Sequence, residues 1–495
     1  MPPTPAAPPA HDTRAPDSPS CLVFFCFAWS LYGLAHQLLT YQLWLQFADP
    51  AHLALGAATC AAAACGILAP ASLGRFTTLL LVWSAYKLYL MPYVPNHVLF
   101  TLLANITILV AIGWRTLRPR EGKTLAQAAF EDYAPLVRCE LLALYFWVVF
   151  HKLNVDFFNP EVSCGWSLYF EIRGVVPFMP VFDGLRYLTI YGTLATEALL
   201  PILLAARKTR ALGVLLGTAF HITLALHPNP YIMSFTTMLF GAYTLFWPEP
   251  WIRATMGAWR NSSMGSLMAH RGLLVLLAAA GLFSMVVLVM AAVDGGINET
   301  SVIDVLSRVA PVTVWLIGLI YCAIALTWVS TRLLRQPMPG EPLLLQMRRT
   351  PAAVLVIIVA LNGLPPYLGI RDQSSFAMFS NLRTSGGSTN HLFMPVSIRL
   401  SDRQDDIVVL GESNDDNLSD FREAGYDMTW FEFRRHLAKQ GCGFTVTYTR
   451  NGVTETLSLP IDANHEAFVP PPWWLRKLLW VNLVAPRDKP CRCRR

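Results

Sequence analysis

The chain has 495 residues, of which 54% are hydrophobic and only 14% are charged. This apolar content exceeds that of ordinary globular domains and is typical of a chain that crosses a membrane several times. The net charge of +6 is modest, and no run of basic residues lies beside an aromatic platform. A nucleic-acid-binding protein is therefore not expected.

The ten cysteines contain no pair of CxxC motifs, so the sequence predicts no structural zinc site. Six of them lie in or beside apolar segments, where thiols behave as small hydrophobes. The remaining four leave their disulfide pairing open. They are Cys164, Cys442, Cys491 and Cys493.

The first twenty residues are rich in proline and predict a disordered tail, not the charged region of a signal peptide. After them, apolar runs long enough to cross a core of about 30 Å recur along the chain. About eleven spans are predicted, at 21–47, 52–70, 74–93, 97–116, 137–153, 185–206, 210–227, 231–248, 271–293, 308–330 and 351–369.

Basic residues outside these spans gather in alternate connections, which predicts the orientation of the chain. Clusters follow the fourth span (115–123), the sixth (207–210) and the tenth (332–349), whereas the opposite connections hold few Lys or Arg residues. By the positive-inside rule the N-terminus is cytoplasmic and the C-terminal region lies outside. The preferred compartment is a bacterial inner membrane or a plasma membrane.

Hydropathy drops after the last span, and the sequence predicts a small α+β domain on the outer face over residues 370–470. Segments 395–400 and 444–449 have the β-branched and aromatic residues of strands, and 427–440 has the spacing of an amphipathic helix. Residues 471–495 mix Trp with Arg and Lys, as an interfacial helix does. The same pattern equally fits a segment buried against the domain. The predicted fold is thus an all-α polytopic membrane domain, 21–369, with an α+β domain at its C-terminus.

Lys152 is a cation at the end of an apolar span, and on this topology it lies at the outer boundary with other polar residues. They are His97, His151, Glu197, His221 and His227. Ionisable residues within a membrane bundle are functional candidates. Each also has a structural explanation, since Lys152 can snorkel to the interface, His97 can anchor its helix, His221 can be a hydrogen-bonded core residue, and Glu197 can pair with an arginine.

If Lys152 lies in a low-dielectric pocket, its charged form loses hydration and the neutral amine becomes available as a base. A neighbouring histidine can stabilise the oxyanion that remains after proton removal. This chemistry suits an apolar substrate with an acidic hydroxyl group, such as a hydroquinone, that arrives through the bilayer.

The stretch FHKLNVDFFNPEVSC, residues 150–164, resembles the signature of the HTTM (horizontally transferred transmembrane) domain family, which includes the vitamin K-dependent gamma-glutamyl carboxylases. Three other pieces agree in order and spacing: Asn96-His97, Glu197 with the following LLPILLAARKTRALGV, and Phe220-His221 with the apolar span to Pro248. The resemblance covers roughly residues 21–330 and is strongest over 92–250.

This resemblance implies that Lys152 deprotonates reduced vitamin K or another quinol, with His97 and His221 assisting. The anion then reacts with oxygen to form a strong base, which removes a proton from glutamate so that carbon dioxide can add. A glutamate-containing protein or peptide is the implied partner, beside membrane lipid. Substrate-binding roles are expected for His151, Asn154, Glu197 and His227, and no metal is implied.

The segment SFAMFSNLRTSGGSTNHLFMP, residues 375–395, resembles one in bacterial HTTM proteins and adds Asn390 and His391 as substrate-binding candidates, although a turn-rich connector explains it equally well. Two positions depart from the family: His151 replaces a lysine, and Asn154 replaces an acidic residue. The large lumenal domain is also replaced, so recognition of a carboxylase propeptide is not expected.

Two other functions stay open. One is a non-catalytic membrane scaffold that binds a partner or lipid, and the other is a carrier in which Lys152 is the counter-charge of a small anion.

Overall fold

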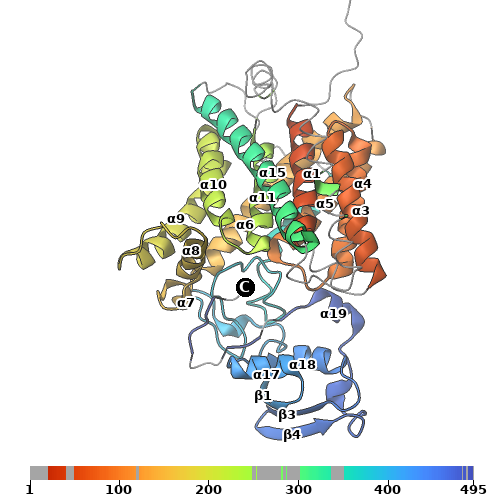
Figure 1. Cartoon of the computed structure of the whole chain (residues 1–495), viewed down its shortest axis with the longest axis vertical. Helices are drawn as coiled ribbons and strands as arrows, with labels where there is room; N and C mark the ends of the chain where they lie inside the picture. Colours follow the sequence, from red (N-terminus) through yellow and green to blue (C-terminus); the bar gives the residue numbers. More distant parts are fainter. Residues whose placement is uncertain are drawn as a thin grey trace, which may run out of the picture.

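The computed structural model describes residues 20–40, 49–118, 122–247, 252, 280–282, 286, 302–335, 350–481, 483–485 and 489–493. Within these ranges the chain forms a bundle of helices with a small antiparallel sheet at one end (Figure 1). We call this end the domain face. The predicted tail lies outside the described residues except for Ser20, and so does most of the predicted span at 271–293.

The bundle consists mainly of long apolar helices. In the N-terminal half these are α1 (Ser20–Leu39), α3 (Pro50–Leu68), α4 (Leu73–Leu90), α5 (Asn96–Thr116) and α6 (Leu125–His151). After the short α7 (Val155–Phe158) come α8 (Cys164–Val175), α9 (Leu185–Ala205), α10 (Arg210–Ala225), α11 (Pro230–Tyr243), α15 (Val302–Arg335) and α16 (Ala353–Leu361). Among the described residues, six helices are long and apolar enough to cross a membrane, namely α1, α3, α5, α6, α9 and α15. This is the pattern of a multi-pass membrane protein.

The predicted count of eleven spans is not confirmed. Helices α4, α10 and α11 coincide with predicted spans but are shorter or less apolar than the six. The predicted span at 351–369 contains only α16, whose nine residues cover about 14 Å, less than half of a hydrocarbon core of about 30 Å. Beyond α16 the chain turns repeatedly instead of continuing as a helix.

Helix α6 begins twelve residues before the predicted span at 137–153, because its charged first turns are paired. Thr124 and Gln127 form a capping box at its start. Asp132 accepts hydrogen bonds from the Arg115 guanidinium at 2.5 and 2.8 Å. These partners stabilise a polar helical extension that hydropathy alone does not detect.

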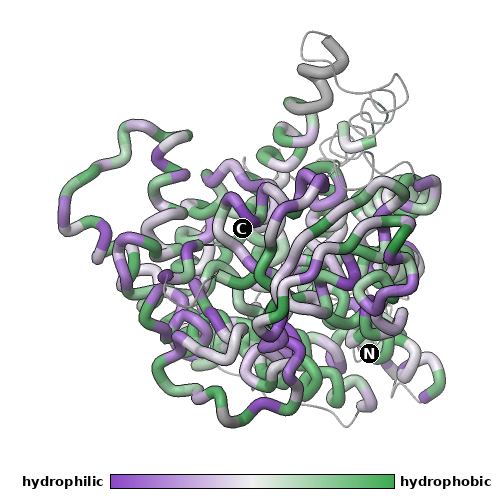
Figure 2. The backbone as a smooth tube through the Cα atoms, turned by 90° about the horizontal axis from the view of Figure 1, so that it is seen from below, coloured by the Kyte–Doolittle hydropathy of each residue, from purple (hydrophilic) through white to green (hydrophobic). Residues whose placement is uncertain are grey.

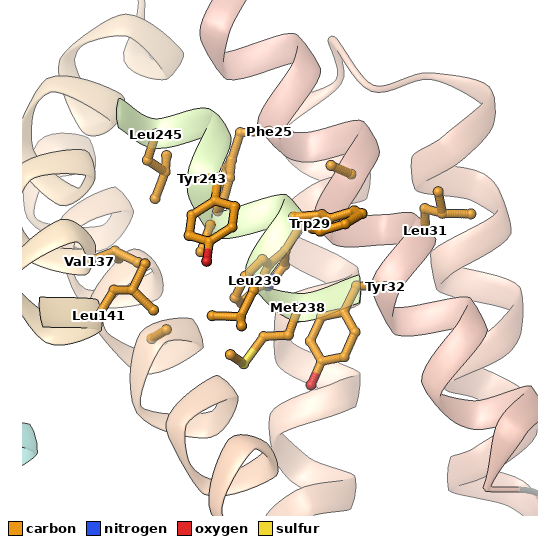
Figure 3. Close-up of a cluster of buried hydrophobic side chains, with 14 of the residues drawn as sticks. Phe25, Trp29, Leu31, Tyr32, Val137, Leu141, Met238, Leu239, Tyr243 and Leu245 are labelled. Carbon is orange, nitrogen blue, oxygen red and sulfur yellow. The ribbon is translucent and has the colours of Figure 1, made fainter. Parts of the chain in front are cut away.

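Helix α1 lies at the centre of the bundle and packs against α3, α11 and α15. Figure 3 shows Trp29 and Tyr32 of α1 beside Met238 of α11. The two polar atoms of these rings are satisfied, since Trp29 Nε1 donates to Asn105 Oδ1 at 2.9 Å and the Tyr32 hydroxyl lies 2.7 Å from Thr101 Oγ1. Buried aromatic rings with such partners fix α1 against α5.

The C-terminal sheet has the strand order β2-β1-β3-β4, and all neighbours are antiparallel. Its strands are β1 (Ile407–Ser413), β2 (Met428–Thr429), β3 (Thr445–Arg450) and β4 (Val453–Ser458), with helices α17 (Asp416–Glu423) and α18 (Trp430–Leu437). The turn between β3 and β4 is Asn451-Gly452, both with positive φ, as a tight hairpin requires. In Figure 2, which looks from the domain face, hydrophilic segments in purple alternate with hydrophobic ones in green over this domain.

Of the elements predicted for this domain, the strand at 444–449 is confirmed as β3, and the helix at 427–440 is present in shorter form as α18. The strand predicted at 395–400 is wrong. That segment is a single 3-10 turn, Val396–Ile398, and the Leu400 amide donates to the Leu368 carbonyl at 2.9 Å instead of joining the sheet. A backbone hydrogen bond to the chain after α16 therefore replaces strand pairing here, which the residue types alone do not reveal.

The predicted interfacial tail has an exposed first part and a buried second part, so each of the two explanations offered for it fits one part. Helix α19 (Trp473–Leu478) has only six residues; its Trp473 is 71% exposed, and Lys477 Nζ donates to the Tyr89 carbonyl near the end of α4 at 2.9 Å. The chain that follows is buried, and Val484 pairs with Asp427 of the sheet domain. The first part is exposed beside the bundle, and the second part belongs to the domain.

Candidate functional site

Lys152 forms a buried ion pair. Its Nζ lies 2.7 Å from Glu197 Oε2, and the two residues are 3% and 8% exposed. Helix α6 ends at His151, so Lys152 is its C-cap, and Glu197 projects from the middle of α9. The ammonium also lies 5.8 Å from the centre of the Phe157 ring. A pair this well shielded from water is a candidate for chemistry, because both partners lose hydration.

The pair lies in the wall of a cavity of about 380 Å³, which we call the lysine cavity. The cavity is bounded by residues of α6, α8, α9, α10 and α11 and is closed towards the domain by Met378 and Phe379. Most of its lining is aliphatic or aromatic, for example Val148, Leu168, Ile172, Phe220, Leu224 and Phe235. An apolar cavity with a few convergent polar groups is the usual form of a small-molecule site.

The lysine cavity reaches the side surface of the bundle. Leu188 lines it and is 61% exposed, and the neighbouring α8 presents Phe170 at 56% exposure. Exposed apolar side chains therefore border the lysine cavity at the surface of the bundle.

A second cavity, of about 370 Å³, contains His97 and is called the histidine cavity. It lies on the domain face and is more polar, with Asn96, Asn229, Gln373, Asn381 and Arg492 in its lining. Asn96 itself is engaged, since its Oδ1 accepts from the Phe376 amide at 2.6 Å. His97 is 3% exposed and sits one residue into α5.

The two cavities adjoin, and we call the four side chains that line both the partition: Ile232, Phe235, Met378 and Phe379. The segment that carries Met378 and Phe379 is conformationally unusual. Ser374, Phe376, Phe379 and Asn381 all have positive φ, between 46° and 63°. Left-handed backbone is uncommon outside glycine and is an outlier for aromatic residues, and such strain gathers at functional sites.

His97 belongs to a hydrogen-bonded group behind the histidine cavity. Its Nε2 lies 3.2 Å from Ser234 Oγ, and His36 Nδ1 lies 2.7 Å from the same hydroxyl. The ring centroids of the two histidines are 5.9 Å apart. Ser234 of α11 thus positions the ring of His97. The sequence analysis selected neither Ser234 nor His36, although His36 lies within the predicted span 21–47.

His221, a predicted catalytic residue, lies behind the lysine cavity. Its Nε2 is 3.0 Å from the Tyr145 hydroxyl, which is 2.5 Å from the Tyr243 hydroxyl. The adjacent Phe220 lines the cavity, whereas His221 does not. Its place is in a buried polar network between α6, α10 and α11, where it bonds to Tyr145.

His227 is paired with a residue that the sequence analysis did not single out. Its Nε2 lies 2.9 Å from Glu171 Oε2 of α8, and its Nδ1 accepts from the Asn229 amide at 3.0 Å. Tyr169 and Ile172, near Glu171 on the same helix, line the lysine cavity, whereas Glu171 does not. His227 therefore holds α8 against the start of α11 and does not line either cavity.

His151 and Asn154 flank Lys152 but point elsewhere. His151 Nε2 donates to the Ser375 carbonyl at 3.0 Å, so its Nδ1 accepts from the Tyr367 hydroxyl at 2.7 Å. The amide group of Asn154 donates to the carbonyls of His151 and Ser380 at 2.7 and 2.6 Å. Both residues are fully buried and fasten the strained segment to the end of α6.

Asn390 and His391 have the same kind of role. Asn390 Nδ2 donates to Asp156 Oδ2 at 2.7 Å, and His391 Nε2 donates to the Phe150 carbonyl at 2.9 Å. Burial lowers the pKa of His391, partly offset by this hydrogen bond to Phe150. Neither residue lines the lysine or the histidine cavity. Their role is therefore to hold the chain around Lys152.

The lining residues that sequence reasoning missed lie on α6, α8, α9, α10 and α11 and in the strained segment. Met378 and Phe379 fell within the segment 375–395, for which only the polar Asn390 and His391 were selected. The signal that could have identified Met378 and Phe379 is that they are apolar residues within an otherwise polar connecting segment. Among the described residues, no group of three or more His, Cys, Asp or Glu side chains is arranged to hold a metal ion.

The two cavities, the ion pair and the partition together form the candidate site. Comparison of the chain with protein-family models, with curated proteins and with solved structures finds no match in any of the three.

Proposed function

We propose that this protein is a membrane enzyme in which Lys152 removes a proton from the acidic hydroxyl group of a lipid-soluble substrate, a quinol. The observation that carries the proposal is the Lys152–Glu197 pair, 2.7 Å apart, in an apolar cavity that reaches the side surface of the bundle. A scaffold needs neither the cavity nor the pair within it. A carrier for a small anion needs a polar passage, whereas this lining is apolar.

Glu197 explains how the amine becomes available as a base. In the ion-paired form Lys152 holds a proton and cannot accept another. When the quinol binds, transfer of that proton across 2.7 Å to Glu197 leaves both groups neutral. The amine then accepts the hydroxyl proton of the substrate, and the carboxyl group keeps the second proton.

The resemblance to the HTTM family supports a carboxylase-type reaction, which needs two substrates. The two adjacent cavities, with the partition between them, provide one site for each substrate. The quinol would occupy the lysine cavity, and a glutamate-containing peptide would enter the more polar histidine cavity from the domain face. When bound, reduced vitamin K or another quinol supplies the electrons for the reaction with oxygen. His97, fixed by Ser234, would donate a hydrogen bond to an oxygen of the ligand in the histidine cavity.

The proposed orientation places the domain face outside the cell. Besides the loop charges, the Cys164–Cys493 disulfide supports it, because disulfides persist in oxidising compartments such as the periplasm and the cell exterior. A bacterial inner membrane or a plasma membrane fits, with the N-terminus in the cytoplasm.

The test is the substitution Lys152→Arg in the full chain reconstituted in nanodiscs. Arginine keeps a positive charge beside Glu197 but does not lose its proton, so the ion pair survives and the base is lost. Oxygen uptake is measured with reduced vitamin K, a glutamate-containing peptide and carbon dioxide, and mass spectrometry detects carboxylated peptide. Turnover should fall by about 100-fold to 10,000-fold, the usual contribution of a general base.

The matched control is Lys123→Arg, the same change in an ion pair with Glu131 at 2.7 Å that lies outside both cavities. It should leave oxygen uptake unchanged. Wild-type turnover in Lys152→Arg, or no quinol-dependent uptake by the wild type, would overturn the proposal. Oxygen uptake without carboxylated peptide would keep Lys152 as the base and remove glutamate as the substrate.

A further inference from the structure

The C-terminal tail crosses the domain face and ends against the helical bundle. After the bridge between Val484 and Asp427, the described residues resume at Lys489, whose carbonyl accepts from Arg383 Nη1 at 3.0 Å. Four residues later, Cys493 forms a disulfide with Cys164, 329 positions earlier in the chain. This bond joins the end of the tail to the first residue of α8.

The disulfide joins parts of both cavities. On one side of the bond, Cys491 and Arg492 line the histidine cavity. On the other side, α8 lines the lysine cavity, beginning with Gly165, the residue next to Cys164. The covalent bond therefore fastens a wall of one cavity to a wall of the other.

Besides the disulfide, the described residues of the tail make polar contacts at this point. The Cys491 amide donates to Asp156 Oδ2 at 3.0 Å, and its carbonyl accepts from Asn381 Nδ2 at 2.8 Å. Asn381 also bonds the Val162 carbonyl and the Cys164 amide, at 2.8 and 2.7 Å. Each such bond contributes about 1 kcal/mol to stability. Their sum is comparable with the free energy needed for local opening of a chain end.

We propose that the Cys164–Cys493 disulfide is a redox latch that holds the C-terminal tail closed as a wall of the histidine cavity. Reduction by a dithiol transfers two electrons and two protons to the bond; the sulfur–sulfur bond breaks, two protein thiols form, and the dithiol becomes a disulfide. The freed tail then leaves Asn381 and Asp156, and the histidine cavity opens to the domain face. This inference does not depend on the reaction proposed for Lys152.

The experiment measures how fast a maleimide reaches the histidine cavity. The variant A377C places a thiol in the cavity lining, and C491S removes the thiol of the tail itself. Labelling of purified full-length protein in detergent is followed by mass spectrometry before and after treatment with dithiothreitol. Cys442, exposed on the sheet domain, is the internal reference for maleimide reactivity.

Reduction should raise the labelling rate of the A377C thiol by about tenfold or more relative to Cys442, because the latch opens locally. The matched variant C164S/C493S should show the fast rate without any reductant and should not respond to dithiothreitol. Equal rates in the oxidised and reduced protein would overturn the proposal. So would the absence of the Cys164–Cys493 cross-linked peptide from protein isolated without reductant.

If C164S/C493S fails to fold, the comparison before and after reduction in the folded A377C/C491S protein decides the matter alone. None of these measurements uses turnover, so loss of the latch and loss of the base at Lys152 give separate results.

Discussion

Lys152 at the end of α6 and Glu197 in the middle of α9 join their helices through an ion pair of 2.7 Å with almost no contact with water. The attraction between the two charges offsets the cost of removing both from water only while both partners are present. The pair therefore links the stability of the bundle to the wall of the lysine cavity.

Removing only the carboxylate should destabilise the protein strongly. In Glu197→Gln the ammonium of Lys152 stays buried without its partner, which costs about 3–5 kcal/mol. The double substitution Lys152→Met with Glu197→Met replaces the pair with apolar chains of similar volume and should recover most of that loss while abolishing turnover. Thermal unfolding in detergent provides the measurement. Equal melting temperatures for Glu197→Gln and the wild type would mean that the pair does not form.

The sequence located the region of the candidate site but not the direction of each side chain. Lys152, His97 and Glu197 were selected from their places at the ends or within spans and from the family resemblance, and all three line a cavity. His151 and Asn154 were selected because they flank Lys152. Past the last turn of α6 the backbone leaves the helical path, so neighbouring residues point in different directions, and both bond to backbone carbonyls instead.

The fold was predictable where apolar periodicity is long and uninterrupted, as in α5 and α9. It was less predictable where a tertiary partner overrides local composition. Asp132 extends α6 through its bonds with Arg115, and the segment at 395–400 bonds to Leu368 instead of the sheet. The disulfide between Cys164 and Cys493 was one of several open pairings, because residues 329 positions apart are brought together only by the complete fold.

Gly217 of α10 should not tolerate alanine, because a Cβ at this position would collide with the ring and hydroxyl of Tyr243. That ring belongs to the network of Tyr145 and His221, so its displacement disturbs the back of the lysine cavity. Overpacking of this kind costs about 1–3 kcal/mol. Thermal unfolding and quinol-dependent oxygen uptake of Gly217→Ala should both decrease.

Gly113 of α5 is the matched control, since no atom lies within 4 Å of a Cβ placed there. Gly113→Ala should leave activity unchanged and stabilise the helix by up to about 1 kcal/mol, because alanine restricts the unfolded chain more than glycine does. If both substitutions had the same effect, the close approach of Tyr243 to α10 would be contradicted.

Glu432 of α18 should make the sheet domain less stable as the pH rises. Its carboxyl group is 8% exposed, and burial raises its pKa from 4.5 to about 7, although Arg435 at 3.1 Å and the Val481 amide at 2.9 Å oppose the shift. In the unfolded chain the group ionises near pH 4.5, whereas the folded protein retains the proton up to about pH 7. The free energy of unfolding therefore decreases between these values, by at most about 3 kcal/mol.

Glu432→Gln removes this titration while keeping an oxygen that can accept from the Val481 amide. Because glutamine resembles the protonated carboxyl group, the variant should be about as stable as the wild type near pH 4.5 and should become more stable than the wild type as the pH rises to 7.5. Unfolding is followed at several pH values through tryptophan fluorescence, to which Trp430 of the same helix contributes. Other titrating groups, such as Asp427, whose pKa burial also raises, are present in both proteins and cancel in the difference. Parallel pH profiles for the two proteins would show that Glu432 is already ionised in the folded state at pH 5.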